Sequence, residues 1–234
     1  MALLKLQQIS KHYTQGEHIV KALDEVDLEL EKGEFAALVG PSGSGKTTLL
    51  NVIGGLDAPS SGTVHLDGTD LTALREAACS DFRLFQIGFV FQAYNLVPVL
   101  SALENVELVM VLQGRSASER RERASHYLQM VGLSGVLGRR PSALSGGQQQ
   151  RVAVARALAA GPRLVLADEP TANLDSDNAS ALLEIMHRLS HEEGVTFLFS
   201  THDPRVMERA ERIITLRDGR IVGDERVPER QHKQ

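Results

Sequence analysis

The sequence predicts an α/β fold in which a core of buried parallel strands is interrupted by a helical insertion. Three short, mainly apolar runs, each followed by a loop or a helix, are typical of buried parallel strands and occupy residues 35–39, 164–167 and 196–200. Helical periodicity dominates the middle of the chain, most clearly over 119–131 and 148–160. A chain that is β-rich first, helical next and α/β at its end is expected to form one core with an inserted helical unit.

The β-rich parts are recognised by alternation and by turn residues. Residues 3–9 mix apolar and polar side chains as an edge strand does, and residues 26–30 alternate strictly. Two Asp-Gly pairs, at 67–68 and 218–219, each follow a short β-rich run. Because Asp-Gly pairs are typical of tight turns between antiparallel strands, we expect a strand pair at each of these positions.

The composition is that of an ordinary globular protein. The chain has 234 residues, of which 42% are hydrophobic and 24% charged, and its formal net charge is -5. This acidic balance argues against a free-standing nucleic-acid-binding protein, which usually carries excess Lys and Arg. Cys79 is the single cysteine and cannot form an internal disulfide. We therefore expect the protein to reside in a reducing compartment.

Two segments bear on a possible membrane location. Residues 85–103 contain no charged side chain and approach the length of a membrane span. Gln, Gly, Asn and Pro residues interrupt this stretch, and unsatisfied amides and helix breakers are costly in hydrocarbon, so we expect a buried strand followed by a loop. Residues 1–8 lack the basic and apolar pattern of a signal peptide.

The first motif that carries chemistry follows the strand at 35–39 and fits the P-loop pattern. Its residues are Gly40, Pro41, Ser42, Gly43, Ser44, Gly45, Lys46 and Thr47. The glycines let backbone N–H groups, and the helix that begins near Lys46, surround phosphate groups. Lys46 would bridge the β- and γ-phosphates, and the Thr47 hydroxyl would hold Mg²⁺. A glycine-rich turn with an exposed lysine is the plain alternative, and a dinucleotide-binding turn fits less well because its third glycine is missing.

A second chemical feature lies at the end of the strand at 164–167. Asp168 and Glu169 follow this strand directly. Side chains of neighbouring strand residues point apart, so the two carboxylates need not do the same work. We expect Asp168 to hold Mg²⁺ and Glu169 to polarise a water molecule for attack on the γ-phosphate. An ordinary polar strand end is the alternative when the pair is considered without the P-loop.

A third feature decides the family. Residues 144–148 read Leu-Ser-Gly-Gly-Gln and precede the helix at 149–160. The last four residues are Ser145, Gly146, Gly147 and Gln148. They expose N–H groups at a helix N-terminus and so form a second anion site. This pentapeptide, between a P-loop and an acidic strand, is the signature of ABC-type ATPases. The chain resembles the ATP-binding subunits of ABC transporters from about residue 3 to residue 222.

The resemblance implies the architecture in more detail. The fold is expected to be a P-loop NTPase core of the ABC type with an antiparallel β subdomain and an inserted α-helical subdomain. One ABC ATPase domain is expected over residues 1–223, with the core in about 1–91 and 161–223 and the helical subdomain in about 92–160. Residues 224–234 are polar and are expected to form a C-terminal tail.

The resemblance also implies which further residues contact the nucleotide. Tyr13 matches the aromatic residue that stacks on adenine, and Thr48 belongs with the nucleotide-binding residues of the P-loop. Gln92 matches the glutamine that contacts Mg²⁺ and the attacking water. His202 matches the histidine that senses the γ-phosphate. The implied cofactors are ATP and Mg²⁺, and the implied catalytic residues are Glu169, His202, Gln92 and Lys46.

The resemblance implies partners as well. In the family, the P-loop and the turn at 145–148 bind different nucleotides, so a head-to-tail homodimer with two ATP molecules between its chains is expected. Asp175 matches the loop that crosses to the other subunit. A separate membrane permease is the second expected partner, contacted around residues 92–99 and the helical subdomain. The chain would then be a peripheral protein at the cytoplasmic face of the inner membrane, with no nucleic-acid partner.

Within the family, several runs resemble the ATPases of lipoprotein-release (LolD) and macrolide-export (MacB) systems, whose permeases are FtsX-like and carry large extracytoplasmic domains. These runs are residues 54–57, 87–92, 95–98 and 104–106. Residues 109–110 depart from the subgroup, because many of its members have a proline there.

The predicted function is ATP hydrolysis that powers a separate permease of the export or lipoprotein-extraction type. The ATPase subunit of an amino-acid-type solute importer is one alternative. A non-transport ABC ATPase acting on nucleic acid or ribosomes is another, although the acidic charge balance offers no surface for a phosphate backbone. The cargo is not predicted, because ATPase subunits of this kind do not usually touch it.

Overall fold

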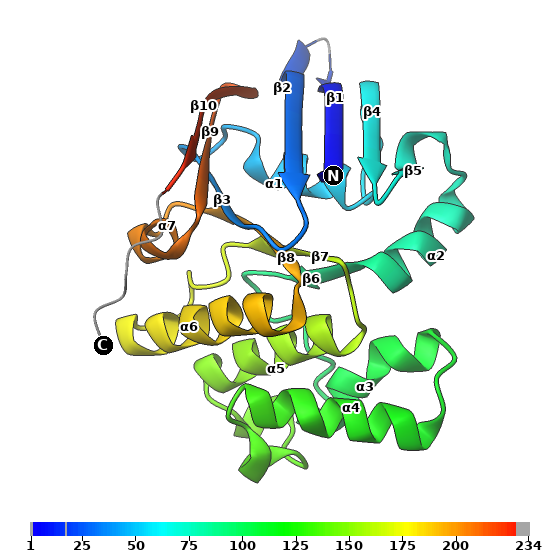
Figure 1. The fold of residues 1–234 in the computed structure, drawn as a ribbon, viewed down its shortest axis with the longest axis vertical. Helices are drawn as coiled ribbons and strands as arrows, with labels where there is room; N and C mark the ends of the chain where they lie inside the picture. Colours follow the sequence, from blue (N-terminus) through cyan, green and yellow to red (C-terminus); the bar gives the residue numbers. More distant parts are fainter. Residues whose placement is uncertain (1, 17, 228–234) are drawn as a thin grey trace.

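The computed structural model describes residues 2–16 and 18–227, which form two sheets with helices around them (Figure 1). The strands are β1 (Ala2–Gln15), β2 (His18–Glu31), β3 (Phe35–Val39), β4 (Ser61–Leu66), β5 (Thr69–Asp70), β6 (Ile87–Val90), β7 (Leu164–Asp168), β8 (Thr196–Thr201), β9 (Arg212–Arg217) and β10 (Arg220–Arg226). The helices are α1 (Lys46–Ile53), α2 (Glu76–Gln86), α3 (Ala102–Leu112), α4 (Ala117–Met130), α5 (Gly146–Ala159), α6 (Ser176–Glu193) and α7 (Pro204–Arg209).

The larger sheet has six strands in the order β10-β9-β3-β8-β7-β6. The pairs from β9 to β6 are parallel, and β10 is antiparallel to β9. The three apolar runs of the sequence are β3, β7 and β8, which confirms that they are buried parallel strands. Each lies between two other strands of this sheet, and burial on both faces explains why these runs do not alternate.

Both faces of the larger sheet are covered by a hydrophobic core. In β3, Phe35 and Ala37 belong to the core shared with α5 and α6, whereas Ala36 and Leu38 belong to the core shared with α1 and the smaller sheet. The ring centroids of Phe35 and Phe199 are 4.5 Å apart. This two-sided packing fixes the carboxyl ends of the parallel strands, where the chemical motifs lie.

The smaller sheet is antiparallel, in the order β2-β1-β4-β5. The expectation that residues 3–9 form an edge strand is therefore wrong, because β1 pairs with β2 on one side and with β4 on the other. Leu4, Leu6 and Ile9 are fully buried in the core below it. The polar residues between them suggested an edge, but they lie on a face of an interior strand that is open to solvent.

The two Asp-Gly pairs form the expected turns. Asp67 and Gly68 connect β4 to β5 with φ values of 49° and 79°, and Asp218 and Gly219 connect β9 to β10 with 49° and 76°. Positive φ at both central residues matches the right-handed twist of the flanking strands, so each pair gives a tight hairpin.

The helical unit contains α3, α4 and α5, which pack against one another through residues such as Met110, Leu128 and Val154. Ser101 begins α3 with a reciprocal capping box to Glu104. The uncharged segment 85–103 contains the last residues of α2, then β6 and a loop, so the expected buried strand and loop are confirmed. None of the helices in the described ranges has the length and apolar character that crossing a membrane requires.

The C-terminal tail begins later than residue 224, where we expected it. β10 continues to Arg226, and its Asp224 carboxylate accepts two hydrogen bonds from Arg212, at 2.7 and 2.8 Å. Arg212 also donates to Glu34 at 3.0 Å, so the ion pairs join the polar end of the chain to the sheet. Residues 228–234 lie outside the described part of the chain.

Candidate nucleotide site

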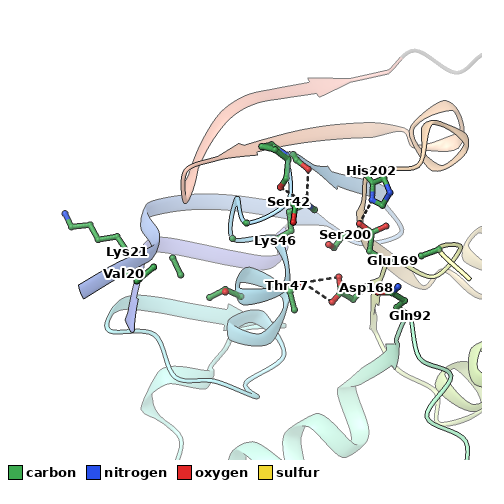
Figure 2. A pocket seen from close by; sticks show the side chains of 17 residues that line it. Val20, Lys21, Ser42, Lys46, Thr47, Gln92, Asp168, Glu169, Ser200 and His202 are labelled. Carbon is green, nitrogen blue, oxygen red and sulfur yellow. Dashed lines mark hydrogen bonds and ion pairs between the residues drawn. The ribbon is translucent and has the colours of Figure 1, made fainter. Parts of the chain in front are cut away.

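A cavity of about 620 Å³ lies at the carboxyl ends of β3, β7 and β8, and it gathers most of the predicted site residues (Figure 2). It is lined by Val20, Lys21, Ala22, Gly40, Pro41, Ser42, Gly43, Gly45, Lys46, Thr47, Thr48, Gln92, Asp168, Glu169, Ala172, Ser200 and His202. Open α/β sheets bind ligands at this end of their strands, because the loops there can carry function without disturbing the core.

The P-loop wraps around the start of α1. Gly45 precedes this helix with φ at 103°, and a Cβ atom there would lie 2.4 Å from the carbonyl oxygen of Ala22, so only glycine fits. The Lys46 ammonium donates to the carbonyl oxygens of Gly40 and Pro41, at 2.8 and 3.1 Å. These contacts hold one buried positive charge and the N-terminus of α1 at the cavity, an arrangement that suits phosphate groups.

Oxygen donors meet beside the P-loop. The Thr47 hydroxyl donates to the Asp168 carboxylate, 3.0 Å from Oδ2, and Gln92 lines the cavity on the same side (Figure 2). Mg²⁺ prefers hydroxyl, carboxylate and amide oxygens, and it usually keeps several water molecules beside one or two carboxylates. These residues therefore fit a Mg²⁺ ion that also binds phosphate oxygens.

Glu169 stands in an unusual backbone conformation at the end of β7. Its φ is 47°, in the left-handed region that a residue with a side chain rarely adopts, and its N–H donates to the carbonyl oxygen of Ser200 at 2.8 Å. Oε1 of Glu169 lies 2.8 Å from Nδ1 of His202, and Oε2 accepts from the Thr201 hydroxyl at 3.4 Å. Such strain persists where the surrounding structure holds it, and it clusters at functional sites.

The two adjacent carboxylates have different partners, as expected for neighbouring strand residues. Asp168 faces Thr47, and Glu169 faces His202 (Figure 2). The Glu169 side chain is 17% exposed, whereas the His202 ring is 76% exposed. Asp168 is therefore suited to metal binding, whereas Glu169 is a shielded carboxylate next to the solvent-facing imidazole of His202.

The signature residues 145–148 do not line this cavity. Ser145 caps α5: its hydroxyl accepts from the N–H of Gln148 at 3.3 Å, and the Gln148 amide oxygen accepts from the N–H of Ser145 at 3.0 Å. Gly146 and Gly147 form the first turn of the same helix. The anion site predicted at these residues is therefore not part of the cavity lining.

Asp175 also lies outside the cavity lining. It caps α6 by accepting from the N–H of Asn178 at 2.9 Å, and hydrogen bonds from Asn178 hold the pKa of its carboxyl below the ordinary value. In the same loop, the Asn173 amide donates to the carbonyl oxygen of Gln92 at 2.9 Å. This contact joins the loop after β7 to Gln92, which follows β6 and lines the cavity.

Tyr13 is not among the cavity-lining residues. Its hydroxyl donates to Asp57 at 2.7 Å, and the Lys11 ammonium lies 5.1 Å from its ring centroid. Its strand partner Val20 does line the cavity, so the ring stands next to the site. Stacking of Tyr13 on adenine stays a prediction.

No sequence motif predicts the contribution of β2 to the cavity. Val20, Lys21 and Ala22 line it, although no motif marks them. They reach the P-loop because Gly219, in the β9–β10 turn, accepts a hydrogen bond from the N–H of Asp24 at 2.9 Å and thereby holds β2 against the core. This long-range pairing leaves no local signal in the sequence.

One prediction concerns Asp203, which follows His202 and caps α7. Burial alone would raise the pKa of the Asp203 carboxyl, but hydrogen bonds from Arg205 and Thr171, the latter at 2.7 Å, outweigh it and hold the pKa below its ordinary value. Because the pKa is lower in the folded state, ionised Asp203 stabilises the fold at pH values above the unfolded-state pKa of about 3.9. This contribution is lost as the pH falls through the folded-state pKa. We expect Asp203→Asn to lower the free energy of unfolding by about 1–3 kcal/mol at neutral pH and by less near pH 3, below the unfolded-state pKa.

Urea unfolding at both pH values measures this difference. Asp81→Asn, at an exposed carboxyl on α2, serves as the control and is expected to change the free energy of unfolding by less than about 0.5 kcal/mol. An equal loss for Asp203→Asn at both pH values would contradict the electrostatic explanation.

The chain is similar to known proteins. Residues 23–172 match the ABC transporter family. The lipoprotein-releasing system ATP-binding protein LolD of Anaeromyxobacter dehalogenans is 50% identical over 222 residues, which cover 94% of this chain and 93% of that protein. The macrolide export ATP-binding/permease protein MacB of Mannheimia succiniciproducens is 44% identical over 224 residues, which cover 96% of this chain but 35% of that protein.

Solved structures agree in fold. The dimeric post-hydrolysis structure of the ATP-binding cassette MJ0796, bound to ADP and Pi, has a TM-score of 0.88 and 44% sequence identity, and the match covers 95% of this chain and 98% of that chain. A protein of the same name is known from Methanocaldococcus jannaschii. The fold class expected from the sequence is therefore confirmed.

Proposed function

Since the chain belongs to the ABC transporter family, as an ATPase subunit of the LolD/MacB type, we propose that it works as an ATP-dependent homodimer that drives a separate membrane permease. One ABC ATPase domain would carry this function. The observation that carries the proposal is the separation of two phosphate-binding features: the P-loop lines the cavity, and the signature residues 145–148 do not.

This separation supports a site that is completed by a second copy. A head-to-tail dimer would place residues 145–148 of one chain over the P-loop of the other and bury an ATP molecule at each of two equivalent interfaces. Asp175, at the N-terminus of α6, would lie near the same interface. The relative MJ0796 is dimeric with ADP and Pi, which supports the same arrangement here.

The residues of the cavity suggest how each part acts on ATP. Lys46 and the N–H groups of the P-loop would neutralise and orient the β- and γ-phosphates. Thr47, Asp168 and Gln92 would hold Mg²⁺, which supplies charge stabilisation at the phosphate oxygens. Glu169 would accept a proton from the attacking water, and His202 would orient the Glu169 carboxylate and contact the γ-phosphate. Hydrolysis would remove the γ-phosphate, which both chains would contact, and the dimer would then open.

The proposed partner is a membrane permease. The relative LolD is named as the ATP-binding protein of a lipoprotein-releasing system, whereas the MacB relatives are named as ATP-binding/permease proteins, of whose length this chain spans about a third. Val99, in the loop after β6, and Leu112, at the end of α3, are each 68% exposed, and burial of these two side chains against the permease would remove apolar surface from water. Through it the chain would lie at the cytoplasmic face of the membrane. The names of the relatives favour an export or extraction system.

A capture experiment tests the permease. Glu169→Gln protein, with ATP and Mg²⁺ present, is bound to detergent-solubilised native membranes, and the retained proteins are identified by mass spectrometry. We expect a permease with a large extracytoplasmic domain to be retained, and we expect Val99→Asp combined with Leu112→Asp to abolish its capture. Val222→Asp, at an exposed apolar side chain on β10, is the control. Capture of a small multi-span solute permease, or of ribosomes, would contradict the proposal.

A further inference from the structure

A second group of metal-ligating side chains lies away from the nucleotide cavity. His187 and His191 are four residues apart on α6 and share one face of the helix. Glu211 stands directly before β9, next to both of them. Nε2 of His187 lies 3.1 Å from Nε2 of His191, and Oε1 of Glu211 lies 3.2 Å from Nε2 of His191 and 3.8 Å from Nε2 of His187.

These distances suit a tetrahedral metal ion. Ligand atoms placed about 2.0–2.1 Å from a tetrahedral Zn²⁺ lie roughly 3.3–3.4 Å from one another. The three observed separations, 3.1, 3.2 and 3.8 Å, bracket that value. The three ligand atoms are therefore already spaced about as a tetrahedral ion requires.

The backbone around the ligands is already fixed. The N–H of Glu211 donates to the carbonyl oxygen of Phe35 at 2.9 Å, and its own carbonyl oxygen accepts from Val227 at 2.7 Å. The His187 ring packs edge-on against the Phe35 ring, with centroids 5.2 Å apart. Because α6 and the start of β9 are both held against β3, the ligands are brought together before any ion binds.

We propose that His187, His191 and Glu211 form a binding site for a first-row transition-metal dication, best suited to Zn²⁺. Two imidazoles and one carboxylate are ligands that Zn²⁺ accepts readily, whereas Mg²⁺ prefers oxygen donors, so this site differs in chemistry from the Thr47–Asp168 site. The fourth position faces solvent, since the His191 side chain is 51% exposed, and a water molecule would fill it. The bound ion joins the last turns of α6 to β9.

The site predicts that metal binding stabilises the fold and depends on pH. At a free Zn²⁺ concentration about 100 times the dissociation constant, the ratio of folded to unfolded protein rises about 100-fold. A metal ion binds the unprotonated nitrogen of an imidazole, so metal binding competes with protons and weakens as the pH drops.

The experiment uses the full chain without nucleotide or Mg²⁺, so that its result is independent of ATP hydrolysis and of the permease. Zn²⁺ affinity is measured by competition with a chromophoric chelator, and Co²⁺ is added as a spectroscopic probe of tetrahedral coordination. The variants are His191→Gln and Glu211→Gln, and His126→Gln, at an exposed histidine on α4, is the control. Circular dichroism of each variant checks its folding, and His191→Gln alters a side chain that is half exposed.

We expect the unaltered chain and His126→Gln to bind one Zn²⁺ and to show the visible absorption of tetrahedral Co²⁺. His191→Gln and Glu211→Gln are expected to weaken Zn²⁺ binding at least about tenfold and to abolish the Co²⁺ band. Absence of saturable Zn²⁺ binding by the unaltered chain would overturn the proposal. Equal Zn²⁺ affinity in the unaltered chain and His191→Gln would overturn it as well, because the ion would then bind elsewhere.

Discussion

Replacement of Glu169 by Gln is expected to lower the rate of ATP hydrolysis by about 10²- to 10⁴-fold and to leave ATP binding intact. The Glu169 carboxylate is held by the left-handed backbone at φ 47° and by the hydrogen bond to His202 at 2.8 Å. An amide at the same place keeps the shape, and its oxygen can still accept from Nδ1 of His202, but it cannot accept the proton of the attacking water. Phosphate release in a single turnover, compared with ATP binding under the same conditions, measures the effect.

The control for this variant is Glu184→Gln, at an exposed glutamate on α6 that lies outside the cavity. It removes the same charge and is expected to leave the hydrolysis rate unchanged. A Glu169→Gln rate within about threefold of the unaltered chain would show that another group accepts the proton, because a general base contributes far more than that.

Replacement of Lys46 by Ala is expected to weaken ATP binding by roughly 30- to 4000-fold, which corresponds to about 2–5 kcal/mol for loss of one partner of a buried charge pair. Lys46 is 9% exposed, and its ammonium also holds the carbonyl oxygens of Gly40 and Pro41. Its loss removes the charge that faces the phosphates and two contacts that shape the loop. Equilibrium titration with a fluorescent ATP analogue measures the affinity.

Lys21→Ala is the matched control, because Lys21 also lines the cavity but is exposed and points away from the P-loop (Figure 2). Water and salt screen a charge at such a position, so we expect an affinity change below about fivefold. Equal losses for the two lysines would mean that overall charge, and not the P-loop contact, determines binding.

The sequence predicts the parts of the fold that depend on local pattern. The P-loop, the acidic strand end and the Asp-Gly turns each need particular residues at fixed spacing, because backbone geometry leaves few alternatives there. Residues 40–47 and Asp168 accordingly stand where the motif requires, at the ends of β3 and β7. β3, β7 and β8 can be predicted from the sequence because burial on both faces of the sheet requires continuous apolar runs.

The features that the sequence does not predict depend on contacts between strands that the local pattern does not show. β1 is an interior strand because β4, some fifty residues later, pairs with its free edge. β10 continues to Arg226 because Arg212, on the neighbouring strand, binds Asp224. Both segments carry polar residues that are typical of edges and tails, so local composition alone points the wrong way.

The candidate site shows the same division. The role of Glu169 can be predicted from its position after β7. Its positive φ and its contact with His202 appear only in the structure, where β7 and β8 lie side by side. The signature residues can be recognised as an anion site, but only the structure places them outside the cavity of the same chain. That placement underlies the proposal that a second copy completes the nucleotide site.

Sedimentation velocity of Glu169→Gln tests this claim most directly, with ATP in one sample and ADP in another. Ser145→Arg is added to the same background to obstruct the N-terminus of α5. Ser116→Arg is the control, because the Ser116 hydroxyl caps α4 in the same way by accepting from the N–H of Glu119 at 3.3 Å. Both substitutions remove a helix cap worth about 1 kcal/mol, so only the position differs. We expect a dimer with ATP for Glu169→Gln alone and with Ser116→Arg, and a monomer with ADP or with Ser145→Arg. A monomer with ATP, or a dimer that tolerates Ser145→Arg, would contradict the account.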